Sequence, residues 1–276
     1  MRLLFVGDSM TIGRAGERTW RYWMTRHLGD CPACRGTGGP PAVVGPWTHQ
    51  YEGEAEGTTA GGTGAGPATG GATDDATDDA AGDGPHLAAW GEGWLHMASR
   101  VRAAVHEARP DVLLVSLGLI DLGFYTDSAG TEANVLRFFT EARAAAPRIR
   151  AVVLPVVPNV RAGTDALFAA EVERFNARLA RLLAGIGGPR SPLLLAPPPT
   201  APPVSYDIRR DTYDGTHPSP SGARKLAAAF ADALHTLRGP ATGPGGAAGT
   251  LLGPPAGTGG VRAPRPGAAS GASRSG

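Results

Sequence analysis

Three side chains in this sequence could form a nucleophilic catalytic set. Ser9 follows the short apolar run Arg2–Val6, and Asp214 and His217 stand three residues apart near the other end of the chain. A carboxylate at that spacing in a turn can reach the imidazole Nδ1, which leaves Nε2 free to take a proton from a hydroxyl. Taken alone, Ser9 fits an ordinary helix N-cap. If the fold brings Ser9 to the Asp214–His217 pair, the three side chains predict acyl transfer through a serine nucleophile.

The elements that must position these side chains alternate between strands and helices. Short apolar runs predict strands at 2–6, 42–44, 112–117, 149–157 and 193–196. Apolar residues at helical spacing predict helices at 17–28, 93–109, 131–146, 165–183 and 219–237. This alternation predicts an α/β fold, a three-layer α/β/α sandwich with a central parallel sheet of about five strands. Active sites of such sheets lie at the carboxyl ends of the strands, where Ser9 falls.

Glycine and proline are unevenly distributed along the chain. They account for 41 and 25 of its 276 residues, and two segments, 53–85 and 239–276, hold most of the excess. These segments have almost no large apolar side chains, so they cannot offset the entropy lost on ordering. We therefore expect a single domain over residues 1–238 with a low-complexity insertion at about 53–85, followed by a disordered tail at 239–276.

Charge and hydropathy disfavour several classes of partner. The chain has 26 Lys+Arg and 25 Asp+Glu, a net charge of +1 that gives no electrostatic case for nucleic acid or an anionic membrane. The apolar stretch Leu3–Val6 is too short for a signal-peptide core, and no apolar run approaches the length of a transmembrane helix. We expect a cytoplasmic protein that acts on a small molecule.

The two cysteines of the chain, Cys31 and Cys34, form a C-x-x-C motif. No second cysteine or histidine pair follows at zinc spacing, so a four-ligand site would need partners from elsewhere in the fold. The sequence therefore predicts two ordinary thiols in a proline-rich loop and no metal. The remaining histidines without partners at ligand spacing are interpreted as ordinary surface or core residues: His49, His86, His96, His106 and His235.

On these residues the sequence resembles the SGNH hydrolases, also called the GDSL esterase/lipase family. Gly7-Asp8-Ser9 matches the first of the four motif blocks of that family, and Asp214 with His217 matches the last, D-x-x-H. The resemblance covers the chain outside its two low-complexity segments. It implies the flavodoxin-like SGNH fold, Ser9 as nucleophile, His217 as general base, Asp214 as its orienting partner, and no cofactor.

The two middle blocks of that family supply the donors of an oxyanion hole, a glycine N–H and an asparagine amide. The resemblance implies the N–H groups of Ser9 and Gly93, with Gly91 as the second choice. Where the family has G-x-N-D, this chain has Gly118-Leu119-Ile120-Asp121, so Ile120 replaces the asparagine. Isoleucine cannot donate a hydrogen bond, and losing one oxyanion donor typically costs about 10²–10³ in rate.

Three explanations of Ile120 stay open. The hole could use the N–H groups of Ser9 and Gly93 alone, or Asn159, just past a predicted strand, could supply the missing amide. The chain could also have exchanged hydrolysis for acyl transfer or for binding. Asp8 and Asp121 are interpreted as structural carboxylates that hold local backbone N–H groups.

The residues together predict a serine esterase that cleaves an ester of a small acylated metabolite through an acyl-enzyme intermediate. Two alternatives remain at this stage. One is an acyltransferase that uses the same Ser-His-Asp set in a biosynthetic pathway. The other is a non-catalytic binding protein that kept the SGNH fold.

Overall fold

The computed structural model describes residues 1–35, 39–52 and 84–238. All of these residues lie in one compact unit, Met1–Ala241. The predicted insertion at 53–85, apart from its last two residues, and the predicted tail at 239–276 fall outside the described residues. These two predictions therefore stay predictions.

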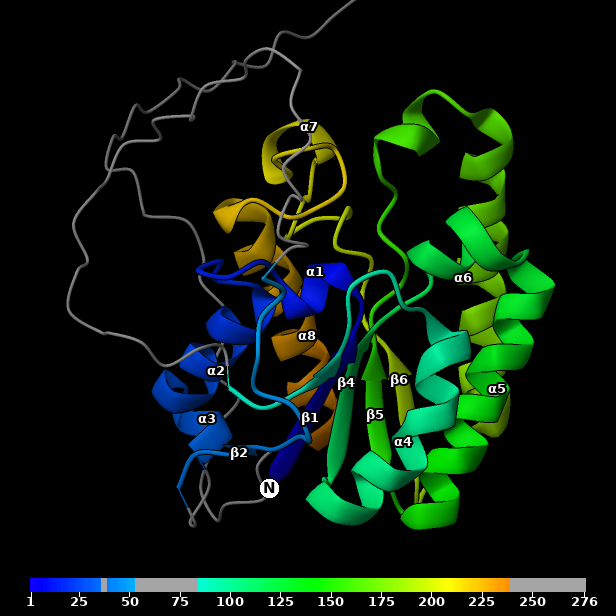
Figure 1. The fold of residues 1–276 in the computed structure, drawn as a ribbon. Coiled ribbons are helices and arrows are strands. Elements are labelled where there is room, and N and C mark those ends of the chain that lie inside the picture. Colours follow the sequence, from blue (N-terminus) through cyan, green and yellow to red (C-terminus); the bar gives the residue numbers. More distant parts are fainter. Residues whose placement is uncertain (36–38, 53–83, 239–276) are drawn as a thin grey trace, which may run out of the picture. The chain divides into compact units, whose positions relative to one another are not determined.

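A parallel sheet forms the centre of this unit (Figure 1). Its strands are β1 (Arg2–Gly7), β2 (Ala42–Val43), β3 (Leu87–Ala88), β4 (Val112–Ser116), β5 (Arg150–Val153) and β6 (Leu193–Leu195). The order is β2-β1-β4-β5-β6, and β3 pairs with the end of β1. Every pairing is parallel, which confirms the predicted α/β fold and adds one short strand, β3.

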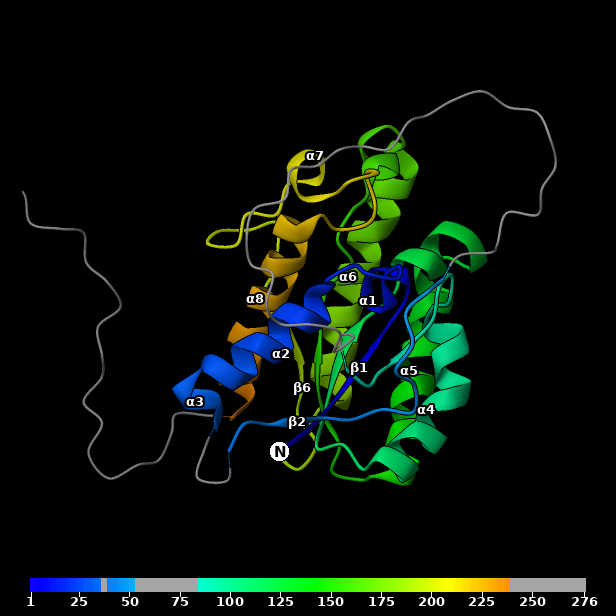
Figure 2. The ribbon, with the colours of Figure 1, turned by 60° about the vertical axis from the view of Figure 1, so that its left-hand side comes forward.

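Helices cover both faces of this sheet (Figures 1 and 2). Helices α4, α5 and α6 pack on one face, and α2 and α8 pack on the other. The helices are α1 (Ser9–Ile12), α2 (Trp20–Asp30), α3 (Pro32–Arg35), α4 (Trp94–Ala108), α5 (Ser128–Ala145), α6 (Ala166–Ile186), α7 (Ile208–Asp211) and α8 (Pro220–Arg238). A π-helical turn, η1 (Asp121–Tyr125), and a 3₁₀ turn, η2 (Val160–Gly163), complete the described elements. Within the described ranges, every helix is too short or too polar to cross a bilayer.

The two hydrophobic layers follow from the alternation of side chains along each strand. In β1, Leu3 and Phe5 face the layer of α2 and α8, whereas Leu4 and Val6 face the layer of α4, α5 and α6. All four are fully buried. A strand covered on both faces needs apolar side chains at every position, which is why its sequence is one continuous apolar run.

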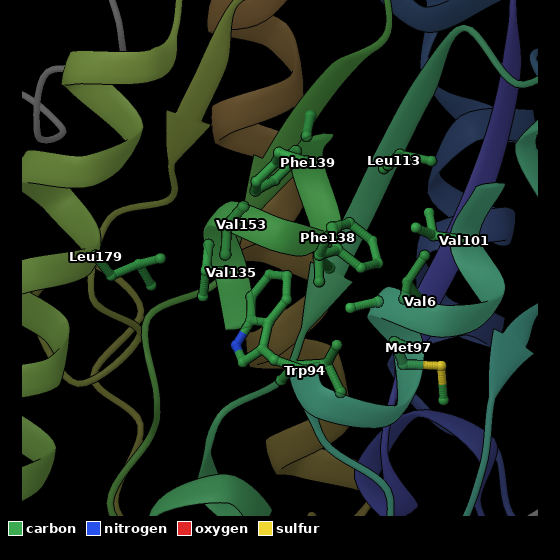
Figure 3. Packing of buried hydrophobic residues seen from close by; sticks show 14 of the residues in the cluster. Val6, Trp94, Met97, Val101, Leu113, Val135, Phe138, Phe139, Val153 and Leu179 are labelled. Atoms are coloured by element: carbon green, nitrogen blue, oxygen red, sulfur yellow. The ribbon is translucent and has the colours of Figure 1, made fainter. Parts of the chain in front are cut away.

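The first turn of α4 is anchored deeply in the larger of these layers. Figure 3 shows Trp94 beside Phe138 of α5, and their rings meet edge to face with centroids 5.1 Å apart. Trp94 is fully buried, as are Met97 and Val101 on the same helical face. This packing fixes the start of α4 and the loop that leads into it from β3.

The strand predicted at 149–157 is shorter in the structure. β5 ends at Val153, and the chain then leaves the sheet. Pro155 and Pro158 lack the N–H that a ladder requires, so the apolar composition of this segment does not extend the strand. The segment from Leu154 to Val157 is nevertheless buried, and it carries the chain toward the site at the carboxyl ends of β1 and β4.

Candidate active site

Ser9 is the first residue of α1, directly after the turn that ends β1. The N-cap is Asp8, whose Oδ1 accepts a hydrogen bond of 3.0 Å from the Met10 N–H. The N–H of Ser9 has no acceptor inside the helix, because the first turn of any helix leaves its donors free. The turn itself requires glycine before it: a Cβ on Gly7 would lie 1.9 Å from Oγ1 of Thr11.

The structure brings Ser9, His217 and Asp214 into one hydrogen-bonded row. The His217 Nε2 lies 3.0 Å from the Ser9 Oγ, and its Nδ1 lies 2.6 Å from the Asp214 Oδ2. Ser9 and His217 are 208 residues apart in sequence. The imidazole therefore has a carboxylate on one nitrogen and a hydroxyl on the other, the arrangement in which it can act as a general base.

Asp214 is held as an anion by its own turn. Burial raises its pKa, but the hydrogen bonds from the His217 ring and from the N–H groups of His217 and Thr216 outweigh burial and place its pKa below the ordinary value. The two backbone N–H groups lie 2.7 and 2.9 Å from Oδ1, which leaves Oδ2 for the imidazole. Gly215 makes the turn possible with its φ of +85°.

Two aromatic rings stack on the His217 imidazole and fix its orientation. Trp90 stacks on it with ring centroids 4.8 Å apart and an angle of 22° between the planes. Tyr213 also stacks on it, at 5.8 Å and 17°. Tyr51 stacks in turn on Trp90 at 4.5 Å. Trp90 also lines one of the cavities at Ser9. Tyr51 and Tyr213 carry no signal in the sequence.

Two cavities meet at Ser9 and His217. One, of about 530 Å³, has a largely apolar and aromatic wall that includes Trp90, Leu119, Ile120 and Phe124. The other, of about 390 Å³, has a wall with more charged side chains, including Glu17, Arg18 and Arg224. A bound molecule could thus place one part on either side of the Ser9 hydroxyl.

The structure argues against Gly93 as an oxyanion donor. Its N–H donates to Nδ1 of His96 at 3.2 Å, and Gly93 is not among the residues that line either cavity at Ser9. Gly93 instead packs on Asp121, since a Cβ there would lie 2.2 Å from the Asp121 Oδ2. Gly91, the second choice, lines the 530 Å³ cavity with Ser9 and has a φ of +72°.

Ile120 and Asn159 both line that same cavity. The Asn159 Nδ2 donates to the Thr216 Oγ1 at 3.3 Å, which ties Asn159 to the loop that carries Asp214 and His217. An amide nitrogen has two donors, so this bond leaves a second hydrogen. Asn159 therefore stands where it could replace the donor that Ile120 lacks.

Asp8 and Asp121 both accept hydrogen bonds from backbone N–H groups, local ones for Asp8 but ones 26 and 27 residues away for Asp121. Asp121 is fully buried, and its two oxygens accept from the N–H groups of Trp94 and Leu95 at 2.9 and 3.3 Å, at the start of α4. Burial raises the pKa of Asp8 to about 7, and the nearby Asp121 charge adds to the effect. Gly118, with a φ of +122°, supports a turn in which a Cβ would lie 2.7 Å from Val156.

The prediction that Cys31 and Cys34 lie in a proline-rich loop is wrong for Cys34. Cys31 directly follows α2, and Cys34 lies in α3. The structure places both beside His27 of α2 and His235 of α8, with the four ligand atoms within 4.8 Å of one another. No residue spacing indicates this cluster, because Cys34 and His235 are 201 residues apart in the sequence.

Comparison with known families adds one match. A model described as the GDSL-like Lipase/Acylhydrolase family matches residues 58–225. The match includes Asp214 and His217 and begins beyond Ser9. No curated protein matches the chain.

Several solved structures are similar in fold. An acetyl esterase mutant with an acetate ion is 16% identical, with a TM-score of 0.63 over 86% of this chain and 97% of that chain. A carbohydrate esterase family 3 protein from Talaromyces cellulolyticus is 17% identical, with the same TM-score and coverages. A family 3 carbohydrate esterase from Clostridium thermocellum is 18% identical, with a TM-score of 0.58 over 86% of this chain and 98% of that chain. At these identities the likeness concerns the fold.

Proposed function

This chain belongs to the GDSL-like lipase/acylhydrolase family and is an ester hydrolase of the SGNH type, and we propose that it cleaves an ester of a small acylated metabolite with Ser9 as the nucleophile. The observation that carries this proposal is the hydrogen-bonded row from Asp214 through His217 to Ser9, with distances of 2.6 and 3.0 Å. Each of the three side chains meets the geometric requirement of its role.

The reaction proceeds in two halves. The His217 Nε2 takes the Ser9 proton while Oγ bonds to the ester carbonyl carbon, and the same proton then passes to the leaving alcohol as the C–O bond breaks. Water next attacks the acyl-enzyme, gives a proton to His217, and releases the acid while Ser9 regains its hydrogen. Asp214 keeps Nδ1 protonated and stabilises the imidazolium through both halves.

The oxyanion that forms in each half needs donors in a low-dielectric site. The proposed donors are the N–H groups of Ser9 and Gly91 and the amide of Asn159. All three residues line the 530 Å³ cavity. In this proposal Asn159 supplies what Ile120 cannot, so hydrolysis does not require the asparagine of the family pattern.

In this proposal the acyl group and the leaving alcohol of the substrate occupy different cavities. The cavity at Leu119, Ile120 and Phe124 offers large apolar side chains, which suit the acyl group. The cavity at Glu17, Arg18 and Arg224 offers charged groups, which suits a polar leaving alcohol. An acetyl esterase is among the proteins of similar fold, which is compatible with a small acyl group.

The test is labelling with a fluorophosphonate probe together with turnover of short-chain aryl esters. The wild-type chain should be labelled and active, whereas Ser9→Ala should lose both. Ser99→Ala, an exposed serine on α4, serves as the matched control and should keep both. Equal labelling of Ser9→Ala would refute the nucleophile assignment.

A second measurement separates hydrolysis from acyl transfer. Products are analysed with and without an added acceptor alcohol. Free acid should dominate at modest acceptor concentrations. Ester exchange that outruns hydrolysis would replace this proposal with an acyltransferase that uses the same side chains.

A further inference from the structure

Two histidines and both cysteines form a compact cluster between α2, α3 and the end of α8. His27 lies in the last turn of α2, Cys31 directly follows that helix, Cys34 lies in α3, and His235 lies in the last turn of α8. Cys34 is buried, and the other three are half-buried. Both cysteines are free thiols. Nothing in the proposed ester hydrolysis uses these four side chains.

Four of the six distances between the ligand atoms lie within about 0.5 Å of the edges of a zinc-centred tetrahedron. Zinc bonds of about 2.0–2.1 Å to nitrogen and about 2.3 Å to sulfur place two nitrogens about 3.3 Å apart and a nitrogen and a sulfur about 3.6 Å apart. The two Nε2 atoms are 3.4 Å apart. The sulfur-to-Nε2 distances are 3.5 Å for Cys31–His235, 3.8 Å for Cys34–His27 and 3.1 Å for Cys34–His235.

We propose that His27, Cys31, Cys34 and His235 form a structural Zn²⁺ site. Two thiolates and two imidazoles are a donor set that zinc prefers, and four protein ligands close the coordination shell. Such a closed shell has no position for substrate, so the role is structural. The C-x-x-C spacing supplies two ligands from one turn, while the histidines come from two helices.

The charges of the site balance. Zn²⁺ displaces one proton from each thiol, and the two thiolates neutralise the metal charge. The guanidinium of Arg238 donates to the Cys34 carbonyl at 2.7 Å, which fixes the end of α8 against α3.

The proposed site lies at the end of the sheet away from Ser9. In both ribbon views α3 lies near the start of β1, whereas α1, which carries Ser9, lies at its end (Figures 1 and 2). The metal would tie the α2–α3 corner to the last turn of α8, residues 201 positions apart. Helices α2 and α8 belong to the same hydrophobic layer, and α8 begins soon after His217. A zinc ion that joins these two helices would therefore stabilise the scaffold of the active site.

The test begins with the full chain purified under reducing conditions from zinc-supplemented medium. Metal analysis should find one zinc per chain, and replacement by Co²⁺ should give the visible absorption of a tetrahedral thiolate complex. Cys34→Ser and His235→Gln should each weaken zinc binding by more than about 100-fold, since even the outer partners of zinc ligands are worth about 10–100-fold. His106→Gln, an exposed histidine in the last turn of α4, is the matched control and should bind zinc as the wild type does.

Stability gives an independent readout that needs no variant. Zinc at about a hundredfold excess over its dissociation constant should raise the Tm of the wild type by about 5–10 °C, and a chelator should reverse the shift. Less than a tenth of an equivalent of zinc, with no tetrahedral cobalt spectrum from the reduced apoprotein, would overturn the proposal. So would a Cys31–Cys34 disulfide whose reduction fails to restore metal binding.

Discussion

Asn159 lies where the loop after β5 meets the loop that carries the catalytic pair. Its Nδ2 bonds to Thr216, and it lines the cavity that Ser9 opens into. We expect Asn159→Ala to lower kcat by about 10²–10³, or about 2.7–4 kcal/mol, because one oxyanion donor is lost. Steady-state kinetics on a short-chain aryl ester measure the effect.

Thr216→Val is the control for that experiment, because it removes the hydroxyl that Asn159 contacts and keeps the amide. Its loss should be much smaller than that of Asn159→Ala. If the two variants lose rate equally, Asn159 positions the loop rather than the oxyanion. If neither loses rate, backbone N–H groups alone form the hole.

The raised pKa of Asp8 predicts how the free energy of unfolding depends on pH. Its pKa is raised to about 7 by burial and by the Asp121 charge. Between its ordinary value near 3.8 and about 7, the folded chain holds a proton that the unfolded chain has released. Stability should therefore fall as pH rises through this range, by up to about 1.4 kcal/mol per pH unit. Asp8→Asn should flatten this fall, because asparagine keeps the acceptor for Met10 and has no proton to lose.

Urea unfolding at pH 5 and pH 8 measures this difference. Glu107→Gln, an exposed carboxylate on α4, should leave the pH dependence of the wild type intact. Parallel pH curves for Asp8→Asn and the wild type would mean that Asp8 is ionised in the folded chain throughout the range.

For single residues of the site, the sequence predicts those features that depend on the spacing of near neighbours. Ser9 after a strand and the Asp214–His217 turn each follow from a few neighbouring residues. The predicted donor Gly93 is less favoured than Gly91 in the structure, because the Gly93 N–H is directed to His96 and its backbone packs on Asp121. Two glycines separated by one residue cannot be distinguished before those contacts are known.

The start of α4 depends on a carboxylate from another element. Asp121, in η1, accepts from the N–H groups of Trp94 and Leu95. We expect Asp121→Ala to lower the free energy of unfolding by about 1–3 kcal/mol, because it leaves buried donors unpaired. Asp121→Asn should lose less, since it keeps an oxygen acceptor. Thermal unfolding should show a Tm decrease of about 2–4 °C per kcal/mol.

The catalytic activity should also depend on the first turn of α4. Gly91 lies three residues before α4, so a frayed first turn should lower kcat in Asp121→Ala at temperatures where the chain is still folded. A variant that loses stability and keeps the wild-type kcat would show that the Gly91 segment is positioned independently of α4.

Elements of different length were predictable to different degrees. The apolar faces of α4 and α8 extend over four turns or more, so their periodicity is visible in the sequence. β3 has only two residues and forms because β1 offers a free edge beside Val6 and Gly7. A two-residue strand has no periodicity, and only its pairing partner defines it.

For the whole molecule, the features that the sequence does not predict are contacts between residues far apart in the chain. The Ser9–His217 contact could be inferred because parallel strands bring their carboxyl ends to one edge. No such rule relates Cys34 to His235, because their contact depends on how α2 and α8 pack. The sequence therefore predicted the proposed catalytic set and missed the cluster.

The two cavities at Ser9 predict how the molecule divides its substrate. Ile120 is an apolar side chain in the wall of one cavity, and Arg224 is a charged side chain in the wall of the other. We expect Ile120→Phe to lower kcat/KM for octanoyl esters by about tenfold or more, because added bulk excludes a long chain. Acetyl esters should be nearly unaffected, since a two-carbon acyl group stays beside Ser9. A series of aryl esters of increasing acyl length measures the change.

Arg224→Ala is the matched change on the other side of Ser9. This variant should keep the acyl-length preference of the wild type. Only the dependence of kcat/KM on the structure of the leaving alcohol should change. If Arg224→Ala shifts the acyl-length preference and Ile120→Phe does not, the acyl group occupies the cavity at Arg224 and the assignment is reversed. Because both cavities open onto the same hydroxyl, this pair of variants determines the direction in which the ester lies across the catalytic row.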